Sequence, residues 1–432
     1  MKKLSAILFA ALFAAVFVLS SVACAPSGGG EGEEKTVRQN GIVFLLSDDG
    51  ASYSVKGLAE EKTELTIPAA VGGIPVTKIE TSAFSGNKAL KSVTLSENIS
   101  EIGFYAFDNC ESIETLVIPE GVLKIGYKAF SDCKSLSELV LPNSLEKISS
   151  TAFENCTGLS SVSFGDGLIE IGKDAFINCT EIEELRVGGI ESVADVNYGN
   201  SYSSPIRYAD KLIISGEYSE KLSVTGVDAI TPYAFYGYLG CKELVISGDV
   251  MTIGTSAFSG CDSLESISLG GRLATVGVSA FYSCASLKDV YVGENVVSFG
   301  AFAFYLCNSI ERVIVSDVAA WCNIDFYTDT ETSSNPLRYA EKFFVDSEEI
   351  SHLVIPEGVD RICTNAFFGF AAFKEVTIPK SCKVIEASAF HSCRGIERVN
   401  YAGTAKEFSG IYIMENNAAL HNAEKVYLSD GE

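Results

Sequence analysis

Apolar residues return along most of this chain at a fixed interval of 23 positions. Residues 102–118 read IGFYAFDNCESIETLVI and residues 125–141 read IGYKAFSDCKSLSELVL, so the two copies align without a gap. In the first copy the shared positions are Ile102, Ala106, Phe107, Cys110, Ile113, Leu116 and Ile118. A fixed period of this length is typical of a solenoid, in which one structural unit is stacked many times.

The pair Ala-Phe stands at the same position in eleven units between residues 83 and 390. One unit cannot bury its own apolar residues, so we expect each phenylalanine to stack on the next and neighbouring strands to pair at ~4.8 Å. The cysteine three positions after phenylalanine should stack in the same way. The predicted structural ladder therefore includes Phe107, Phe130, Phe153, Cys110, Cys133 and Cys156.

Each unit contains two predicted elements. Its apolar-x-apolar end has period 2 and is rich in β-branched residues, which predicts a short strand. The segment around Ala-Phe has helix-like spacing over about one turn, which predicts a short helix or 3₁₀ turn. Near the start of the repeats, apolar residues 41–46 and residues 52–55 flank the turn Asp48-Asp49-Gly50. This pattern predicts a β-hairpin that caps the first coil.

The unit can be written as I-x-x-x-A-F-x-x-C-x-x-L-x-x-L-x-L, and this motif resembles the repeats of BspA-like leucine-rich repeat surface proteins, over roughly residues 38–432. The resemblance implies an α/β repeat solenoid that is curved and right-handed. A parallel β-sheet would line its concave side, with short helices or 3₁₀ turns on the convex side. The resemblance also implies contacts with host proteins, matrix proteins or other cells.

The period breaks twice, because 59 residues separate Phe176 from Phe235 and 63 separate Phe304 from Phe367. Both breaks carry a similar sequence, SPIRYADKLI at 204–213 and NPLRYAEKFF at 335–344, and a diverged third copy lies at 418–427. The expected organisation is a cap at 37–78 and a solenoid at 79–432, with longer units near 188–229, 316–356 and 400–432. The loops 195–204 and 326–335 are either spacers or part of a binding rim. After the last strand, at 425–428, the expected Ala-Phe coil is missing, so we expect a truncated chain or an end coil covered by a partner.

The first 36 residues are predicted to direct and anchor the protein. Lys2 and Lys3 precede an apolar run that is short for a membrane span, which indicates a secretory signal at 1–23. The sequence Ser21-Val22-Ala23-Cys24 resembles a bacterial lipoprotein box, so we predict lipidation of Cys24; the alternative is ordinary signal cleavage. Residues 24–36 would form a flexible tether. The predicted location is the bacterial cell surface, facing outward and touching the membrane through the lipid anchor alone.

Charge narrows the list of partners. The chain of 432 residues has a formal net charge of −24, and no cluster of Lys or Arg interrupts this acidity. Nucleic acids and anionic membrane surfaces would be repelled. We therefore expect a protein ligand of unknown identity, with a glycan as the alternative.

Thirteen cysteines in a secreted chain normally suggest disulfides. Eight of them, however, occupy the single repeat position three after phenylalanine, which favours a buried ladder of reduced thiols. Some disulfides remain an alternative, whereas a metal site is disfavoured because there is no C-x-x-C pair. The three histidines are scattered, and no nucleophile, base and orienting group come together. We expect no enzyme, no metal and no cofactor.

The central residue of each strand should point outward, because side chains alternate along a strand. Among these positions, Val117, Val140, Tyr291 and Ile314 are predicted to form a binding face. Plain strand preference of valine is the alternative explanation. The expected function is a surface-anchored, non-catalytic binding or adhesion protein. The alternative is an envelope, structural or glycan-binding role, which the scarcity of outward aromatic residues weakens.

Overall fold

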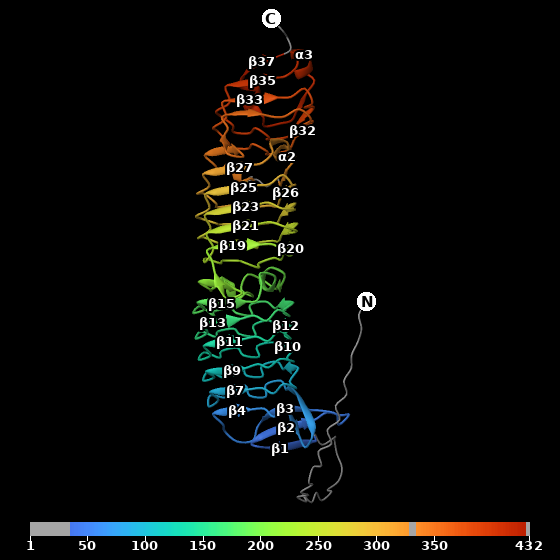
Figure 1. Ribbon diagram of the computed structural model, residues 1–432, viewed down its shortest axis with the longest axis vertical. Coiled ribbons are helices and arrows are strands. Elements are labelled where there is room, and N and C mark those ends of the chain that lie inside the picture. The colour runs from blue at the N-terminus through green and yellow to red at the C-terminus, as the bar shows by residue number, and fades with distance from the viewer. Residues whose placement is uncertain (1–34, 328–333, 429–432) are drawn as a thin grey trace, which may run out of the picture. The chain divides into compact units, whose positions relative to one another are not determined.

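The structure, a computed structural model, describes residues 35–327 and 334–428. The predicted signal 1–23, Cys24 and part of the loop 326–335 lie outside these residues. All described elements belong to one compact unit, Thr36–Glu432. The unit is a stack of coils, and each regular coil contributes a strand of three or four residues on one side and a two-residue strand on the other (Figure 1). This confirms a repeat solenoid built on parallel strands with little helix.

The longer strands form what we call the long-strand column, which runs along one side of the stack (Figure 1). Its members are β4 (Glu64–Thr66), β7 (Ser92–Thr94), β9 (Thr115–Val117), β11 (Glu138–Val140), β13 (Ser161–Ser163), β15 (Glu184–Val187), β17 (Lys211–Ile214), β19 (Lys221–Val224), β21 (Glu243–Ile246), β23 (Ser266–Leu269), β25 (Asp289–Val292), β27 (Arg312–Val315), β29 (Lys342–Val345), β31 (His352–Val354), β33 (Glu375–Ile378), β35 (Arg398–Tyr401) and β37 (Glu424–Tyr427).

The opposite side carries the short-strand column, which the sequence does not predict as strand. Its members are β8 (Glu101–Ile102), β10 (Lys124–Ile125), β12 (Lys147–Ile148), β14 (Glu170–Ile171), β16 (Asn197–Tyr198), β20 (Ala229–Ile230), β22 (Thr252–Ile253), β24 (Thr275–Val276), β26 (Ser298–Phe299), β28 (Asp325–Phe326), β32 (Arg361–Ile362), β34 (Val384–Ile385) and β36 (Tyr412–Ile413). Within each sheet of either column, neighbouring repeat strands pair in parallel, as in Lys124 with Lys147.

The Ala-Phe segments are not helical, in contrast to the expectation from the sequence. In the coil that carries β9, the N–H of Ala106 donates to Gly103 O at 3.4 Å and the N–H of Cys110 donates to Phe107 O at 3.2 Å, which closes separate turns. Asn109 has a φ of 60°, a value found at the third position of type II turns and incompatible with a continuing right-handed helix. The N–H of Phe107 instead bonds the next coil, at Ala129 O.

The hairpin predicted near the start is confirmed: β2 (Ile42–Leu46) and β3 (Tyr53–Leu58) are antiparallel. β1 (Thr36–Gln39) adds an outer antiparallel strand. β3 pairs in parallel with β6 (Ile74–Ile79), which links the hairpin to the short-strand column, while β5 (Ala70–Val71) pairs antiparallel with β6.

The longer units contain the described helices. These are α1 (Glu191–Ala194), α2 (Val318–Cys322), α3 (Ala405–Phe408), α4 (Ala418–Asn422) and the 3₁₀ helices η1 (Pro205–Arg207) and η2 (Pro336–Arg338). In the first two longer units the long strand turns back into a short antiparallel partner, β18 (Glu217–Tyr218) or β30 (Glu348–Glu349). At the far end, β36 and β37 continue both columns in parallel, so residues 405–428 are not folded back as a closed cap.

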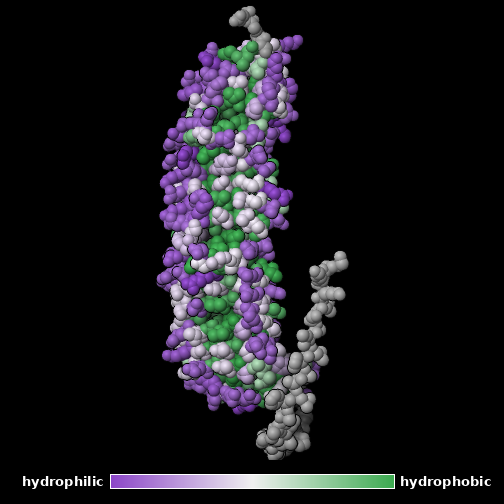
Figure 2. All heavy atoms as spheres, in the orientation of Figure 1, coloured by the Kyte–Doolittle hydropathy of each residue, from purple (hydrophilic) through white to green (hydrophobic). Residues whose placement is uncertain are grey.

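The core is a set of stacked side-chain ladders between the two columns. The phenylalanine rings of successive Ala-Phe pairs stack at 4.9–5.5 Å between centroids. Phe107 and Phe130 are 0% exposed, and their rings lie within 3° of parallel. In Figure 2 a band of apolar residues runs along the stack between the columns, with hydrophilic residues beside it.

Candidate functional site

The cysteine ladder lies beside the phenylalanine ladder, inside the core. The Sγ of Cys110 donates to Phe84 O at 3.1 Å, and the Sγ of Cys133 donates to Phe107 O at 3.4 Å. The twelve cysteines of the described residues are all free and buried. Burial raises the pKa of Cys110 to about 12 and the pKa of Cys133 well above its ordinary value. Such thiols stay protonated at neutral pH, whereas the thiolate is the nucleophilic form.

Side chains of the long-strand column alternate between outward and buried, as the period-2 pattern predicts. In β9 the flanking Leu116 is buried whereas Val117 is 53% exposed, and Val140 in β11 is 52% exposed. Tyr291 and Ile314 also point outward but are half-buried. The described residues thus place all four side chains on the same column.

These four residues form two separate pairs. Tyr291 lies directly beside Ile314 in the β25–β27 ladder. Val117 and Val140 lie in β9 and β11, which are eight and seven strands earlier in the column. With ~4.8 Å between strands, the two pairs are on the order of 35 Å apart. A small ligand cannot touch both, and a single site would require an extended partner.

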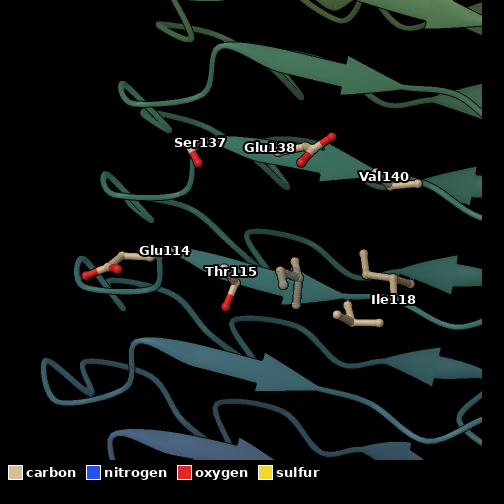
Figure 3. A pocket seen from close by; sticks show the side chains of 8 residues that line it. Glu114, Thr115, Ile118, Ser137, Glu138 and Val140 are labelled. Atoms are coloured by element: carbon tan, nitrogen blue, oxygen red, sulfur yellow. The ribbon is translucent and has the colours of Figure 1, made fainter.

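Val117 and Val140 line a cleft of about 400 Å³ between their two strands. Its wall combines the aliphatic side chains of β9 with polar groups at the start of β9 and β11, including Glu114 and Glu138 (Figure 3). This volume lies near the lower end of the range for small-ligand pockets, roughly 300–1,000 Å³. A second cleft of about 410 Å³ lies on the same column, where β29, β30 and β31 meet, and is lined by residues that include His352 and Val354. At both places a partner can make more than a flat contact with the column.

The acidic end of the cleft is only partly neutralised. Glu114 pairs with Lys91 at 3.7 Å, but both side chains are about 60% exposed, and ion pairs of that kind contribute little, roughly 0–1 kcal/mol. In the described structure Glu138 has neither an ion-pair partner nor a side-chain hydrogen bond. The cleft therefore offers negative charge next to an apolar surface.

In the described residues, the histidines His352 and His391 contact side chains of neighbouring coils. His352 Nε2 lies 2.8 Å from Thr377 Oγ1, and the ring of His391 stacks on Phe368. Within residues 35–327 and 334–428, no three His, Cys, Asp or Glu side chains form a group that could hold a metal ion. In the same residues, none of the helices is long and apolar enough to cross a membrane.

Reasoning from the sequence missed the carboxylates Glu114 and Glu138. They belong to an acidic chain in which most carboxylates are solvated, and nothing in the repeat marks the coil where a cleft opens. It also missed two clusters in the longer units: Arg207 lies 4.3 Å from the ring centroid of Tyr202, and Arg338 lies 5.9 Å from that of Phe368. The shared motif R-Y-A-[DE]-K was the available signal for these clusters.

The coil architecture defines a leucine-rich repeat solenoid. A family model described as the BspA type leucine rich repeat region matches six times, over residues 63–197, 226–331 and 337–423. The chain belongs to this family. No curated protein matches the sequence at a significant level.

Three solved structures illustrate the likeness. A leucine-rich repeat protein from Bacteroides ovatus has a TM-score of 0.53 and 21% identity, with 90% of this chain and 99% of that chain covered. A leucine rich cell surface protein from Faecalibacterium prausnitzii has a TM-score of 0.40 and 23% identity, with 88% and 98% covered. The pneumococcal vaccine antigen PcpA has a TM-score of 0.44 and 18% identity, with 91% and 98% covered. The first of these supports the fold.

Proposed function

We propose that this protein is a non-catalytic binding or adhesion scaffold whose long-strand column contacts a protein ligand. The observation that carries the proposal is the pair of exposed valines, Val117 and Val140, at a cleft between two regular coils. Exposed apolar groups beside a concavity are typical of protein-contact sites. In this proposal the column is the concave face of a right-handed, curved solenoid, as the family resemblance implies.

We place this scaffold on the outside of a bacterial cell. The apolar run at 4–18 supports secretion, and the lipobox-like residues before Cys24 support a lipid anchor. One structural relative is described as a cell surface protein. A stable anchor needs two or more acyl chains, because a single chain binds membranes only marginally. Residues 25–36 would then serve as the tether between membrane and solenoid.

An envelope or glycan-binding role is the competing function. Two outward aromatic residues, Tyr291 and Phe344, flank Ile314 in the column. Both are half-buried, so each exposes only part of its ring for a sugar to stack on. The two functions predict different partners.

The test is to present the purified protein to two panels, one of extracellular-matrix and host surface proteins and one of immobilised glycans. The proposal predicts saturable binding to at least one protein and loss of that binding when Val117 and Val140 are replaced. Binding confined to glycans would contradict the proposed ligand class. Protein binding that is insensitive to the valines would contradict the proposed site.

A further inference from the structure

The hydrogen-bond ladder of the long-strand column is interrupted between β9 and β11. The column comprises separate sheets, and these meet at three interruptions in the described residues. Two of them coincide with the hairpins β17–β18 and β29–β30 of the longer units. The interruption between β9 and β11 falls between two regular coils, where no hairpin intervenes. It is therefore a local opening of the stack and does not result from an inserted element.

The opening leaves backbone groups without their usual partners. The N–H that follows each strand normally donates to the next coil, as in Leu95 to Val117 O at 3.2 Å and Leu141 to Ser163 O at 2.9 Å. At the equivalent position, the described structure gives Ile118 no backbone acceptor. Main-chain donors and acceptors therefore line both walls of the opening, where a ligand or water can satisfy them.

The rest of the same two coils is closed. On the opposite side β10 and β12 are paired, and inside the core the rings of Phe107 and Phe130 stack at 5.1 Å. Before the opening, the N–H of Ser135 donates to Glu111 O at 3.1 Å. After it, the carboxylate of Glu120 accepts from the N–H of Asn143 at 3.0 Å. The cleft thus has two fixed ends and a fixed floor.

Its width selects what can enter. Cα atoms of β9 and β11 still approach within 8 Å, which is less than the two strand spacings, about 9.6 Å, that an inserted strand would need. A single side chain can enter, whereas a whole strand cannot. The walls are apolar at depth: Leu116 and Ile118 are 8% and 7% exposed, compared with 0% and 3% for Leu139 and Leu141 in the next coil.

We infer that this cleft accepts one aliphatic side chain of a protein partner, whose neighbouring Lys or Arg pairs with Glu138. The inference rests on the proposed function and specifies its ligand. The aliphatic group would cover Leu116 and Ile118 between Val117 and Val140. Charge complementarity selects the cation, since Glu138 has no ion-pair partner in the described structure and the chain carries a net charge of −24. In protein interfaces, binding energy concentrates in a few side chains that fill well-packed, desolvated pockets.

The test uses fluorescein-labelled peptides and the purified protein in fluorescence anisotropy. The probe GSKLKSG carries the leucine and both lysines, GSKSKSG lacks the aliphatic side chain, and GSELESG reverses the charge. We expect GSKLKSG to bind about tenfold more tightly than either of the others. Raising the salt concentration should reduce the difference in affinity between GSKLKSG and GSELESG, because screening weakens the exposed charge pair.

Matched variants locate the contact. Glu138→Gln should weaken GSKLKSG about three- to tenfold, while Glu243→Gln, at the same strand position in a closed part of the column, should leave it unchanged. Val140→Ser should weaken GSKLKSG and leave GSKSKSG unchanged. Val245→Ser, at the equivalent position of β21, which is paired on both sides, serves as its control. Far-UV circular dichroism checks that each variant is folded.

Equal affinity for all three peptides, or equal loss in a variant and its control, would overturn this inference. The proposed function has its own readout, namely capture of a protein from the panel and its dependence on Val117 and Val140. If that capture persists while the peptides show no preference, the function stands and the assigned ligand chemistry is wrong.

Discussion

Removing one ring from the phenylalanine ladder tests how the solenoid is held together. Phe130 is 0% exposed and lies between Phe107 at 5.1 Å and Phe153 at 5.4 Å. Phe130→Ala therefore removes a buried aromatic side chain from a site where stacked backbones prevent collapse. We expect the free energy of unfolding to fall by about 3–5 kcal/mol.

The control is an exposed phenylalanine close by in the sequence. Phe104 is 46% exposed, so Phe104→Ala should change stability by no more than about 0.5 kcal/mol. Urea unfolding followed by far-UV circular dichroism measures both variants. A loss below about 1 kcal/mol for Phe130→Ala would refute the view that the stacked rings form the core.

Tryptophan fluorescence measures how far the destabilisation by Phe130→Ala extends along the solenoid. The single tryptophan, Trp321, is 1% exposed and donates to Ala366 O at 2.9 Å, many coils away from Phe130. In a stack stabilised by nearest-neighbour contacts, local destabilisation reaches distant repeats weakly. Phe130→Ala should therefore shift the circular dichroism transition more than the Trp321 fluorescence transition. Equal shifts would show that the whole solenoid unfolds as one unit.

Three further outcomes follow from the ladder and the predicted anchor. Thiol titration of denatured, non-reduced protein should recover nearly all thirteen cysteines, less an acylated Cys24; recovery of fewer than half would show a disulfide framework. The pKa of Cys110 is about 12 in the folded protein and ~8.5 in an unfolded chain. Its contribution to stability is therefore complete below pH ~8.5 and is lost as pH rises towards 12, at up to about 1.4 kcal/mol per pH unit. Between pH 8.5 and 10, the free energy of unfolding should fall by about 2 kcal/mol less in Cys110→Ala than in the unmodified protein. An identical fall in both proteins would contradict a buried neutral thiol. Cys24→Ser should abolish metabolic labelling with palmitate and release the protein from membranes, whereas unchanged labelling would contradict lipidation at this position.

The repeat pattern alone predicts much of the fold. The positions of Phe107 and Cys110 define the interior, because a residue type that returns every 23 positions must meet its own copies when the coils stack. The alternation in β9 likewise predicts that Leu116 is buried and that Val117 is exposed. These inferences need no long-range information, since each coil contacts its nearest neighbours in the stack.

The turn geometry could not be predicted in the same way. Tyr105 and Lys128 adopt φ values of 55° and 52° at the same repeat position. Neither residue type favours this region of backbone conformation, so the sequence carries no local signal. The conformation is imposed by inter-coil bonds, such as the one from Tyr105 N–H to Tyr127 O at 2.8 Å. For the same reason, the repeat pattern does not predict the two-residue strand that Lys124 and Ile125 form.

The cleft between β9 and β11 could not be predicted from the sequence either, but for a different reason. Val117 and Val140 were predicted as outward residues on adjacent strands, which assumes a continuous ladder. The coils that carry β9 and β11 have the same motif as their neighbours, and nothing in that motif distinguishes an open pair from a closed one. Whether two strands remain hydrogen-bonded depends on small differences in packing that a repeat pattern does not contain.

The most direct test of the account is the affinity of the double variant Val117→Asp and Val140→Asp for the protein identified on the panel. Both side chains are about half exposed, so the melting temperature should be nearly unchanged, because surface substitutions stay within about 0.5 kcal/mol. We predict at least a tenfold loss of affinity and no loss in the control Val245→Asp, at the equivalent position of β21, which is paired on both sides. Unchanged affinity would place the binding site elsewhere, and an equal loss in the control would spread it over the whole column.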